Sequence, residues 1–289
     1  MTKLHLIGYA SGLAGVDIRC GDGPLHIQKQ LHNMDLFHWE AIIHPLKSEK
    51  KIIEALHRMS NELALYVSRL INIKEQLCVI GGDHTCAIGT WSGVYNALHK
   101  KGDIGLIWID AHMDSHTPET SHTGRYHGMP LATLLGYGDL KLTGILDNSS
   151  KIKPENVCLI GTRSYENEEV NFLKEQNVKI YYMEEVRERG LQIIIDEAIE
   201  RVTQQTIGFG VSIDLDAIDP KEAPGVDVPE TNGIHANDLR VVLQTLVKNK
   251  KLITTEIAEF DPSKDKDGKT EKIIIEFLTI LANRKESYD

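Results

Sequence analysis

The chain has 289 residues, of which 41% are hydrophobic and 26% charged, and its 32 basic against 42 acidic residues give a formal net charge of -10 at pH 7. This composition is typical of a folded globular protein and excludes a largely disordered chain. The negative charge disfavours nucleic acid and anionic membranes as partners, so small molecules are the expected ligands. The length suits one continuous α/β sheet, and we expect a single catalytic domain over residues 1–289.

The ends and the cysteines indicate a cytoplasmic protein. The N-terminal residues MTKLHLIGYA run into a glycine-rich loop after too few apolar residues for a signal peptide, and no later stretch approaches about 20 apolar residues. The four cysteines are Cys20, Cys78, Cys86 and Cys158. They have no CxxC spacing, and three of the four lie in or beside apolar runs. We therefore expect reduced, buried thiols.

Short apolar runs rich in β-branched residues predict about eight strands, at 4–7, 36–43, 77–80, 104–109, 157–160, 178–182, 207–213 and 252–257. Amphipathic stretches of helical period lie between most of these runs or after the last one, at 51–71, 191–202, 237–247 and 271–281. This alternation predicts an α/β fold of three layers, αβα, with a central and mainly parallel sheet. Ligands bind such sheets beyond the carboxyl ends of the strands, so polar residues that follow a buried strand are candidate site residues.

The first such group follows the apolar run GLIWI at 105–109 and consists of Asp110, His112 and Asp114. On an extended chain, positions two apart share a face, so we expect the three side chains to converge. A single aspartate or histidine here would be an ordinary loop residue. Three in register after five apolar residues favour a metal site.

Two further strands end in similar groups. Asp214 and Asp216 follow the run at 208–213, and two carboxylates forced to one face raise each other's pKa unless a cation neutralises them. The strand at 77–80 leads through Gly81 and Gly82 to Asp83 and His84 at the start of a helix. Taken alone, Asp83 is typical of an N-cap and His84 of a structural residue.

Together the groups offer four carboxylates and two imidazoles, a set that suits manganese better than metals that prefer thiolates. Two divalent ions about 3.5 to 4 Å apart lower the pKa of a shared water from about 15.7 toward about 7. The predicted chemistry is metal-assisted hydrolysis.

Four blocks of the sequence resemble, in order and spacing, the signature motifs of the arginase (ureohydrolase) family, and of bacterial arginases in particular: GGDHT at 81–85, DAHMD at 110–114, HTPETSHTGRYHGMP at 116–130 and SIDLDAIDP at 212–220. Similar segments at 160–164, 223–234 and 259–265 extend the resemblance over nearly the whole chain. It implies an arginase-like fold and a homo-oligomer, either a trimer or a hexamer.

The resemblance also implies two Mn²⁺ per chain, held by six ligands: His84, Asp110, His112, Asp114, Asp214 and Asp216. In the family pattern Asp110 and Asp214 bridge the ions, His84 and Asp114 complete one ion's protein ligands, and His112 and Asp216 complete the other's.

Two more residues match catalytic positions of the family. His127 matches the histidine that moves protons or orients groups near the nucleophile, and Glu259 matches the carboxylate that binds the guanidinium. A guanidinium is a planar fork of donors that pairs well with one carboxylate, and His127 could then protonate the leaving amine.

The substrate loop departs from the family pattern. Arginases hold the amino-acid end of arginine through two asparagines and a serine, and His116, Thr123 and Arg125 occupy those positions, while Glu166 aligns with the aspartate that meets the α-amino group. Arg125 could pair with a substrate carboxylate, or could face solvent or an acidic residue of a neighbouring subunit.

The leading hypothesis for the activity is hydrolysis of L-arginine to L-ornithine and urea. The alternatives are another ureohydrolase (an agmatinase, a guanidino-acid hydrolase or a formimidoylglutamase) and a non-catalytic regulatory member of the family. Retention of all six ligands, His127 and Glu259 argues against the last of these.

Overall fold

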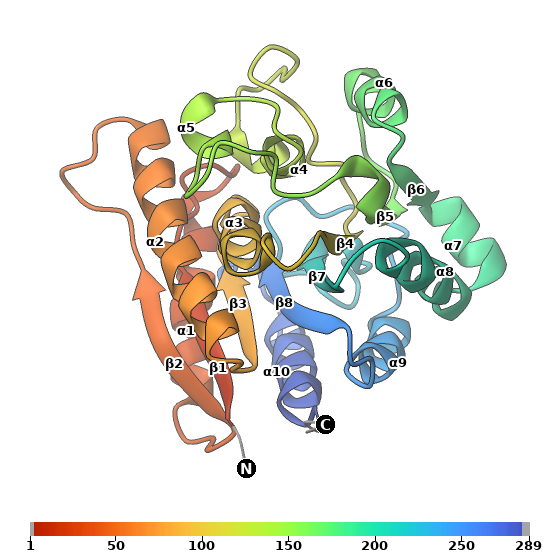
Figure 1. The fold of residues 1–289 in the computed structure, drawn as a ribbon. Helices are drawn as coiled ribbons and strands as arrows, with labels where there is room; N and C mark the ends of the chain where they lie inside the picture. The colour runs from red at the N-terminus through yellow and green to blue at the C-terminus, as the bar shows by residue number, and fades with distance from the viewer. Residues whose placement is uncertain (1–2, 285–289) are drawn as a thin grey trace.

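The computed structural model describes residues 3–284 and contains one parallel sheet with the strand order β2-β1-β3-β8-β7-β4-β5-β6 (Figure 1). The strands are β1 (Leu4–Tyr9), β2 (Phe37–Ile43), β3 (Leu77–Gly81), β4 (Ile104–Ile109), β5 (Val157–Thr162), β6 (Lys179–Tyr182), β7 (Gly208–Asp214) and β8 (Leu252–Ala258). All eight coincide with the predicted runs to within a few residues, and the predicted parallel arrangement is confirmed.

The strands are largely apolar because both faces of the sheet are covered. Along β4, Ile107 and Ile109 belong to one apolar layer, whereas Leu106 and Trp108 belong to the other. Side chains of a strand alternate between faces, so a sheet buried on both sides needs continuous apolar runs. This explains why the strands were recognisable in the sequence.

Helices form the two outer layers. One face is covered by α1 (Gly23–Leu31), α7 (Met183–Arg189), α8 (Leu191–Thr203), α9 (Ala236–Leu246) and α10 (Lys269–Ala282). The other face is covered by α2 (Ile52–Asn72), α3 (Cys86–Leu98), α4 (Pro130–Leu134) and α6 (Asn167–Glu175), and the short α5 (Leu140–Thr143) packs against α2. The four predicted helices correspond to α2, α8, α9 and α10. Within residues 3–284 no helix is long and apolar enough to cross a membrane.

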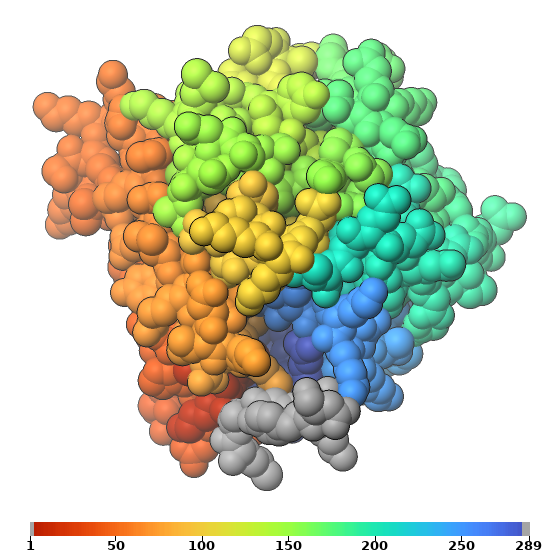
Figure 2. Space-filling view, in the orientation of Figure 1, coloured from red at the N-terminus to blue at the C-terminus, as the bar shows by residue number. Residues whose placement is uncertain are grey.

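The strand order brings together the groups expected to form the site. The central strands β3, β8, β7 and β4 are consecutive neighbours, and their carboxyl ends lie level because Ile80 pairs with Ile257, Asp214 with Ala258 and Ile109 with Ile213. The long connection from β4 to β5 lies over these ends, at the top of the view (Figure 1), and its yellow-green and green atoms cover the upper part of the face shown in Figure 2.

Candidate metal centre

His84 is fully buried and its Nδ1 atom makes no hydrogen bond. Three carboxylate oxygens nevertheless face this nitrogen, at 3.3 Å from Asp110, 3.1 Å from Asp114 and 2.9 Å from Asp214. Buried polar atoms normally have partners, so an unpartnered nitrogen that faces carboxylates is the arrangement expected of a metal ligand.

The ring of His84 is held in the tautomer that a metal requires. Its Nε2 atom lies 2.8 Å from the hydroxyl of Ser212, and that hydroxyl donates its only proton to Glu256 at 2.7 Å. The Ser212 oxygen therefore accepts from Nε2–H, which leaves the lone pair of Nδ1 pointing at the carboxylates. The ring also stacks on Trp108 with centroids 4.3 Å apart. Such partners fix the orientation of a ligating histidine.

The second group converges as predicted, but by a different backbone path. The prediction that Asp110, His112 and Asp114 share a face of extended chain is wrong, because β4 ends at Ile109 and Asp114 has φ 48°. The N–H of His112 donates to Oδ1 of Asp110 at 2.7 Å, which closes a tight turn. This turn places His112 Nδ1 3.6 Å from Asp110 and 3.1 Å from Asp216.

The same device operates at the end of β7. Asp214 is the N-cap of a short 3₁₀ helix, Leu215–Ala217, and its side chain accepts the N–H of Asp216 at 2.8 Å. Asp83, by contrast, is not the helix N-cap that its position suggested, because α3 begins at Cys86 with Thr85 before it. The Asp83 carboxylate instead accepts the N–H groups of Ala14 and Thr85.

Two sets of ligand atoms emerge from these turns. One consists of His84, Asp110 and Asp214, the other of Asp110, His112 and Asp216, and in each set the atoms lie within 4.8 Å of one another. Asp110 is common to both sets, and the carboxylate of Asp114 faces the first. The shared carboxylate is what a pair of adjacent ions needs.

Charge crowding at this centre is severe without a cation. Burial and the neighbouring carboxylates of Asp216 and Asp110 raise the pKa of Asp214 well above its usual value. Burial and Asp110 also raise the pKa of Asp114, to about 6. Carboxylates with raised pKa values in contact with two imidazoles form a donor set that fits divalent cations.

The sequence analysis missed the residues that support these ligands. Glu256 is fully buried and accepts the Trp91 indole N–H at 2.6 Å as well as the Ser212 hydroxyl, and Trp108 donates to Asp110 at 2.8 Å. Ser212 lies inside the SIDLDAIDP block and could have been suspected. Glu256 carries only the weak signal of a charged residue inside an apolar strand.

Glu259 and His127 lie together beside this centre. Glu259 follows β8 with φ 69°, is buried, and accepts the backbone N–H of His84 at 2.8 Å. His127, in the 3₁₀ helix Tyr126–Gly128, has its Nδ1 atom 3.4 Å from the same oxygen of Glu259. Burial lowers the pKa of His127, but Glu259, Asp114 and Asp83 together raise it more, to about 9.

Cys20 is a further contact of Glu259 that the sequence did not indicate. Its thiol lies 3.5 Å from Oε2 of Glu259, although the two residues are 239 positions apart. All four cysteines are free and buried, as predicted.

The predicted substrate residues do not form one group. His116 is buried, with Nε2 3.1 Å from Glu166 and 3.6 Å from Glu169. Thr123 and Arg125 are exposed, and among residues 3–284 Arg125 has no ion-pair partner. The structure therefore places His116 and Glu166 in contact and leaves Arg125 open to solvent.

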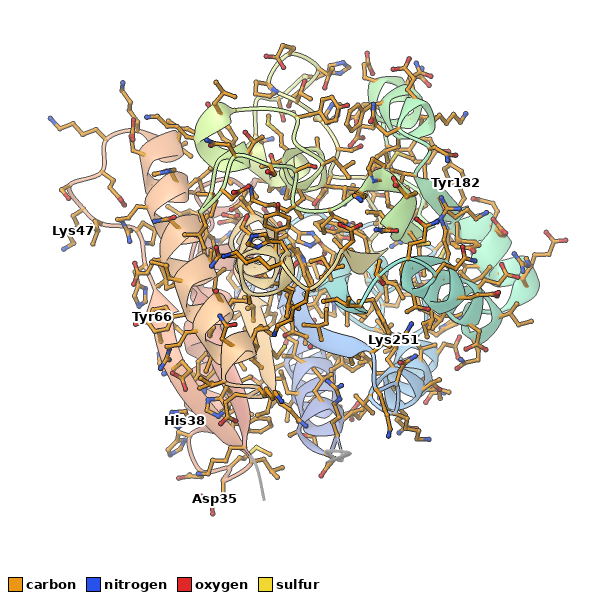
Figure 3. All side chains as sticks on the ribbon, viewed as in Figure 1. Asp35, His38, Lys47, Tyr66, Tyr182 and Lys251 are labelled. Atoms are coloured by element: carbon orange, nitrogen blue, oxygen red, sulfur yellow. The ribbon has the colours of Figure 1, made fainter. Side chains whose placement is uncertain are left out.

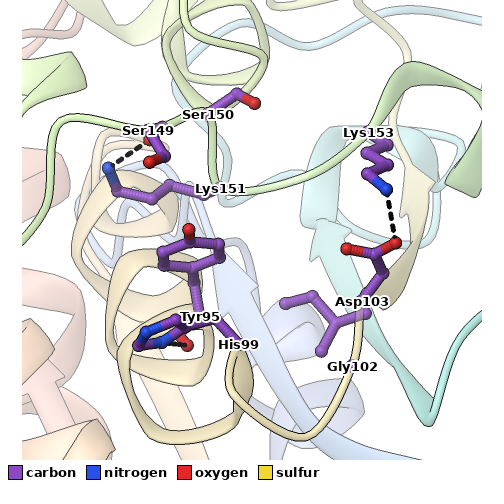
Figure 4. A pocket seen from close by; sticks show the side chains of 9 residues that line it. Tyr95, His99, Gly102, Asp103, Ser149, Ser150, Lys151 and Lys153 are labelled. Atoms are coloured by element: carbon purple, nitrogen blue, oxygen red, sulfur yellow. Dashed lines mark hydrogen bonds and ion pairs between the residues drawn. The ribbon is translucent and has the colours of Figure 1, made fainter.

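A separate cavity of about 220 Å³ lies near the start of β4, away from these residues (Figure 4). Lys151 lines it, and its Nζ atom donates to the carbonyl oxygens of Thr143, Asp147 and Ser149, while Lys153 pairs with Asp103. Both cations are already partnered, so the cavity has no free charge to offer a ligand.

Carboxylates and imidazoles that converge at the ends of adjacent parallel strands, with a histidine and a glutamate beside them, define the class of metal-dependent hydrolases. The family model described as the arginase family matches residues 15–282. The chain is 37% identical to an arginase of Bacillus subtilis (strain 168) over 281 residues, which cover 97% of this chain and 89% of that protein. It is 35% identical to an arginase of Bacillus caldovelox over 265 residues, covering 92% and 84%.

The solved structures agree. The native Bacillus caldovelox arginase superimposes with a TM-score of 0.89 at 33% identity, covering 99% of both chains. The Bacillus subtilis formimidoylglutamase has a TM-score of 0.81 at 20% identity, covering 98% of this chain and 86% of that one, which shows a shared fold only. The chain belongs to the arginase family, and it is a hydrolase that acts on guanidino or amidino groups.

Proposed function

We propose that the chain is a manganese-dependent arginase that hydrolyses L-arginine to L-ornithine and urea in one catalytic domain. The observation that carries the proposal is His84 Nδ1, which is buried, has no hydrogen bond and faces three carboxylate oxygens. The curated arginases similar to this chain support the choice of arginine.

The residues fit a pair of manganese ions. His84 and Asp114 would serve one ion and His112 and Asp216 the other, with Asp110 and Asp214 between them. Oxygen-rich donors with one imidazole per ion suit manganese, and the pair supplies hydroxide from water at neutral pH.

Glu259 and His127 perform the remaining chemistry. The carboxylate of Glu259 pairs with the planar guanidinium and fixes its carbon above the ligand cluster. Its position is rigid because the N–H of His84 and the thiol of Cys20 hold its two oxygens. His127 is close enough to Glu259 to donate a proton to the departing amine, which allows the C–N bond to break without expelling an amide anion.

One contact favours a second candidate substrate class. His116 already pairs with Glu166, the residue aligned with the acid that meets the α-amino group in arginases. A substrate without a free α-ammonium, such as a guanidino acid or formimidoylglutamate, would not need to displace His116. Agmatine lacks the carboxylate that Arg125 could bind, so it is the weaker alternative.

A substrate panel tests the proposal. Manganese-loaded protein is given L-arginine, agmatine, guanidino acids and formimidoylglutamate, with urea measured for the guanidines and glutamate for the last. We expect the highest kcat/KM on L-arginine and no turnover by Asp110→Asn. A preference for a guanidino acid would support the second candidate substrate class over L-arginine. No turnover on any compound would favour a regulatory role.

The remaining proposals follow from the family alone. We propose a homotrimer or a hexamer in the cytoplasm, and sedimentation of the manganese-loaded chain tests the assembly.

A further inference from the structure

A second group of histidine and carboxylate side chains lies on the outer edge of the sheet, where β1 pairs with the edge strand β2. It consists of His5, His38 and Glu40, with donor atoms all within 4.8 Å of one another. His5 on β1 is directly opposite His38 on β2, and Glu40 is two residues further along β2. Figure 3 labels His38 beside β2, at the lower left.

The group is remote from the candidate metal centre. His5 is four residues from Tyr9, the last residue of β1, which at about 3.3 Å per residue places it roughly 13 Å from the strand ends. None of its members belongs to the arginase motifs. A function for these side chains must therefore be sought separately.

Neutral imidazoles alone satisfy these contacts poorly. His5 Nδ1 lies 2.7 Å from Glu40 Oε1 and its Nε2 lies 3.2 Å from Glu75 Oε2, while His38 Nε2 lies 3.5 Å from Glu40 Oε1. The His5–Glu40 contact is a hydrogen bond, and a neutral imidazole has only one N–H, so donation from Nδ1 leaves the lone pair of His5 Nε2 facing the Glu75 carboxylate. The two rings are 5.2 Å apart, and Arg69 also pairs with Glu40.

We propose that His5 Nδ1, His38 Nε2 and Glu40 Oε1 bind a Zn²⁺ ion, with water as the fourth ligand. One cation satisfies the three atoms while both imidazoles stay neutral. Tetrahedral zinc with ligand bonds of about 2.0 to 2.1 Å needs ligand atoms about 3.4 Å apart. The 3.5 Å between His38 Nε2 and Glu40 Oε1 is close to this spacing, whereas the 2.7 Å between His5 Nδ1 and Glu40 Oε1 would have to widen when the ion replaces the hydrogen bond.

The neighbours of the three ligands support this assignment independently. With zinc on Nδ1, the Nε2–H of His5 would face Glu75, which lies 3.2 Å away, as in the arrangement of carboxylate, histidine and metal found at zinc sites. Arg69 pairs with Oε2 of Glu40 and so does not compete for Oε1. The His38 side chain is 55% exposed, which gives the ion a path from solvent.

The bound ion would fasten the edge strand. His5 lies on β1, His38 and Glu40 lie on β2, Glu75 precedes β3 and Arg69 lies near the end of α2. Zinc would link these elements at a sheet edge that otherwise depends on a single neighbouring strand. Its role is structural, and it is independent of the hydrolytic reaction.

Zinc counting on the manganese-loaded protein tests the site. After equilibration with zinc chloride, the wild type should retain one more Zn²⁺ per chain than His38→Ala. Zinc that exchanges into the other metal centre contributes equally to both proteins, so the difference isolates this site. Glu75→Gln should keep the site but weaken zinc binding by about 10- to 100-fold.

His235→Ala is the matched control, because His235 is an exposed histidine paired with one carboxylate, Glu222, at 2.8 Å. It should bind zinc as the wild type does. Zinc should also raise the Tm of the wild type relative to His38→Ala by roughly 5 °C at a hundredfold excess over Kd. Equal zinc content in the wild type and His38→Ala would overturn the proposal and leave the group as an ion-pair network.

Discussion

The candidate metal centre, which forms the floor of the site, and the loop at 116–130 above it differ in how deeply their residues are buried. The floor consists of buried side chains at the ends of four central strands, and Asp110 is only 1% exposed. In the loop at 116–130, by contrast, residues 122–125 are exposed. Substitutions at exposed positions usually change stability little, whereas buried charged groups depend on their partners. We therefore expect changes at the candidate ligands to cost more stability than changes at 122–125.

Metal removal should have the largest effect if the floor depends on its ions. Chelation would leave buried carboxylates with raised pKa values and no compensating cation. We expect complete loss of activity and a Tm lower by roughly 10 °C, both restored by manganese. Calorimetry before and after verified metal removal measures this, and unchanged stability with full turnover would remove the binuclear hypothesis.

Within the floor, the shared ligands should matter more than the others. Asp110 belongs to both candidate ligand sets, whereas Asp114 faces only one. We expect Asp110→Asn and Asp214→Asn to lose both ions and Asp114→Asn to retain one. Elemental analysis of each purified variant gives the count. Equal metal content in the three variants would contradict the bridging roles.

His127 and Glu259 should separate proton transfer from metal binding. His127→Ala should keep two ions per chain and lower kcat by about 10²- to 10⁴-fold, because the Nδ1 atom of His127 faces Glu259, which is not one of the six expected metal ligands. Glu259→Gln should chiefly raise KM, since it weakens the pairing with the guanidinium. Loss of metal from His127→Ala would show that the role assigned to it is wrong.

Glu169 lies between the floor and the loop, and its ionisation should make the stability of the protein depend on pH. It is 4% exposed, accepts the N–H groups of Ser115 and Glu166, and burial raises its pKa to about 8. Between the usual glutamate pKa of about 4.3 and 8, the folded chain holds a proton that the unfolded chain releases, so this group lowers stability as pH rises.

Glu169→Gln cannot lose that proton. We expect the stability advantage of the wild type over this variant to shrink by up to about 1.4 kcal/mol per pH unit across that window. Denaturant unfolding at saturating manganese, at several pH values between 5 and 8, measures the slope. Parallel stability curves would mean that Glu169 is ionised in the folded protein throughout.

The fold and the convergence of the candidate ligands were predictable because their signals are local. Largely apolar runs marked every strand, and each candidate ligand group followed one of them. The path between ligands was not predictable in the same way, since Asp110 and Asp214 each close a turn with a backbone N–H two residues later. The alternation of positions two apart predicted that Asp110, His112 and Asp114 converge, but a turn rather than an extended chain brings them together.

Contacts between residues that are far apart in the chain were even harder to predict from the sequence. Glu256 and Ser212 are 44 residues apart, and Cys20 and Glu259 are 239 apart. Such partners meet only through the strand order, which the sequence does not state. The contact of His116 with Glu166 belongs to the same category, because the two residues are 50 positions apart.

Arg125 should give the smallest effect and the sharpest comparison of substrates. Its guanidinium is exposed and has no ion-pair partner within the described chain, so it is free to meet a substrate carboxylate. If it does, Arg125→Ala should lower kcat/KM for a guanidine with a carboxylate by up to about fivefold and leave agmatine nearly unchanged, because an exposed charge pair contributes about 0.2 to 1 kcal/mol. Glu119→Gln, at another exposed position of the same loop, is a control for disturbance of the loop. An equal loss on both substrates, or none on either, would exclude Arg125 from the substrate site. Discrimination would then rest on the buried side of the loop, where His116 contacts Glu166.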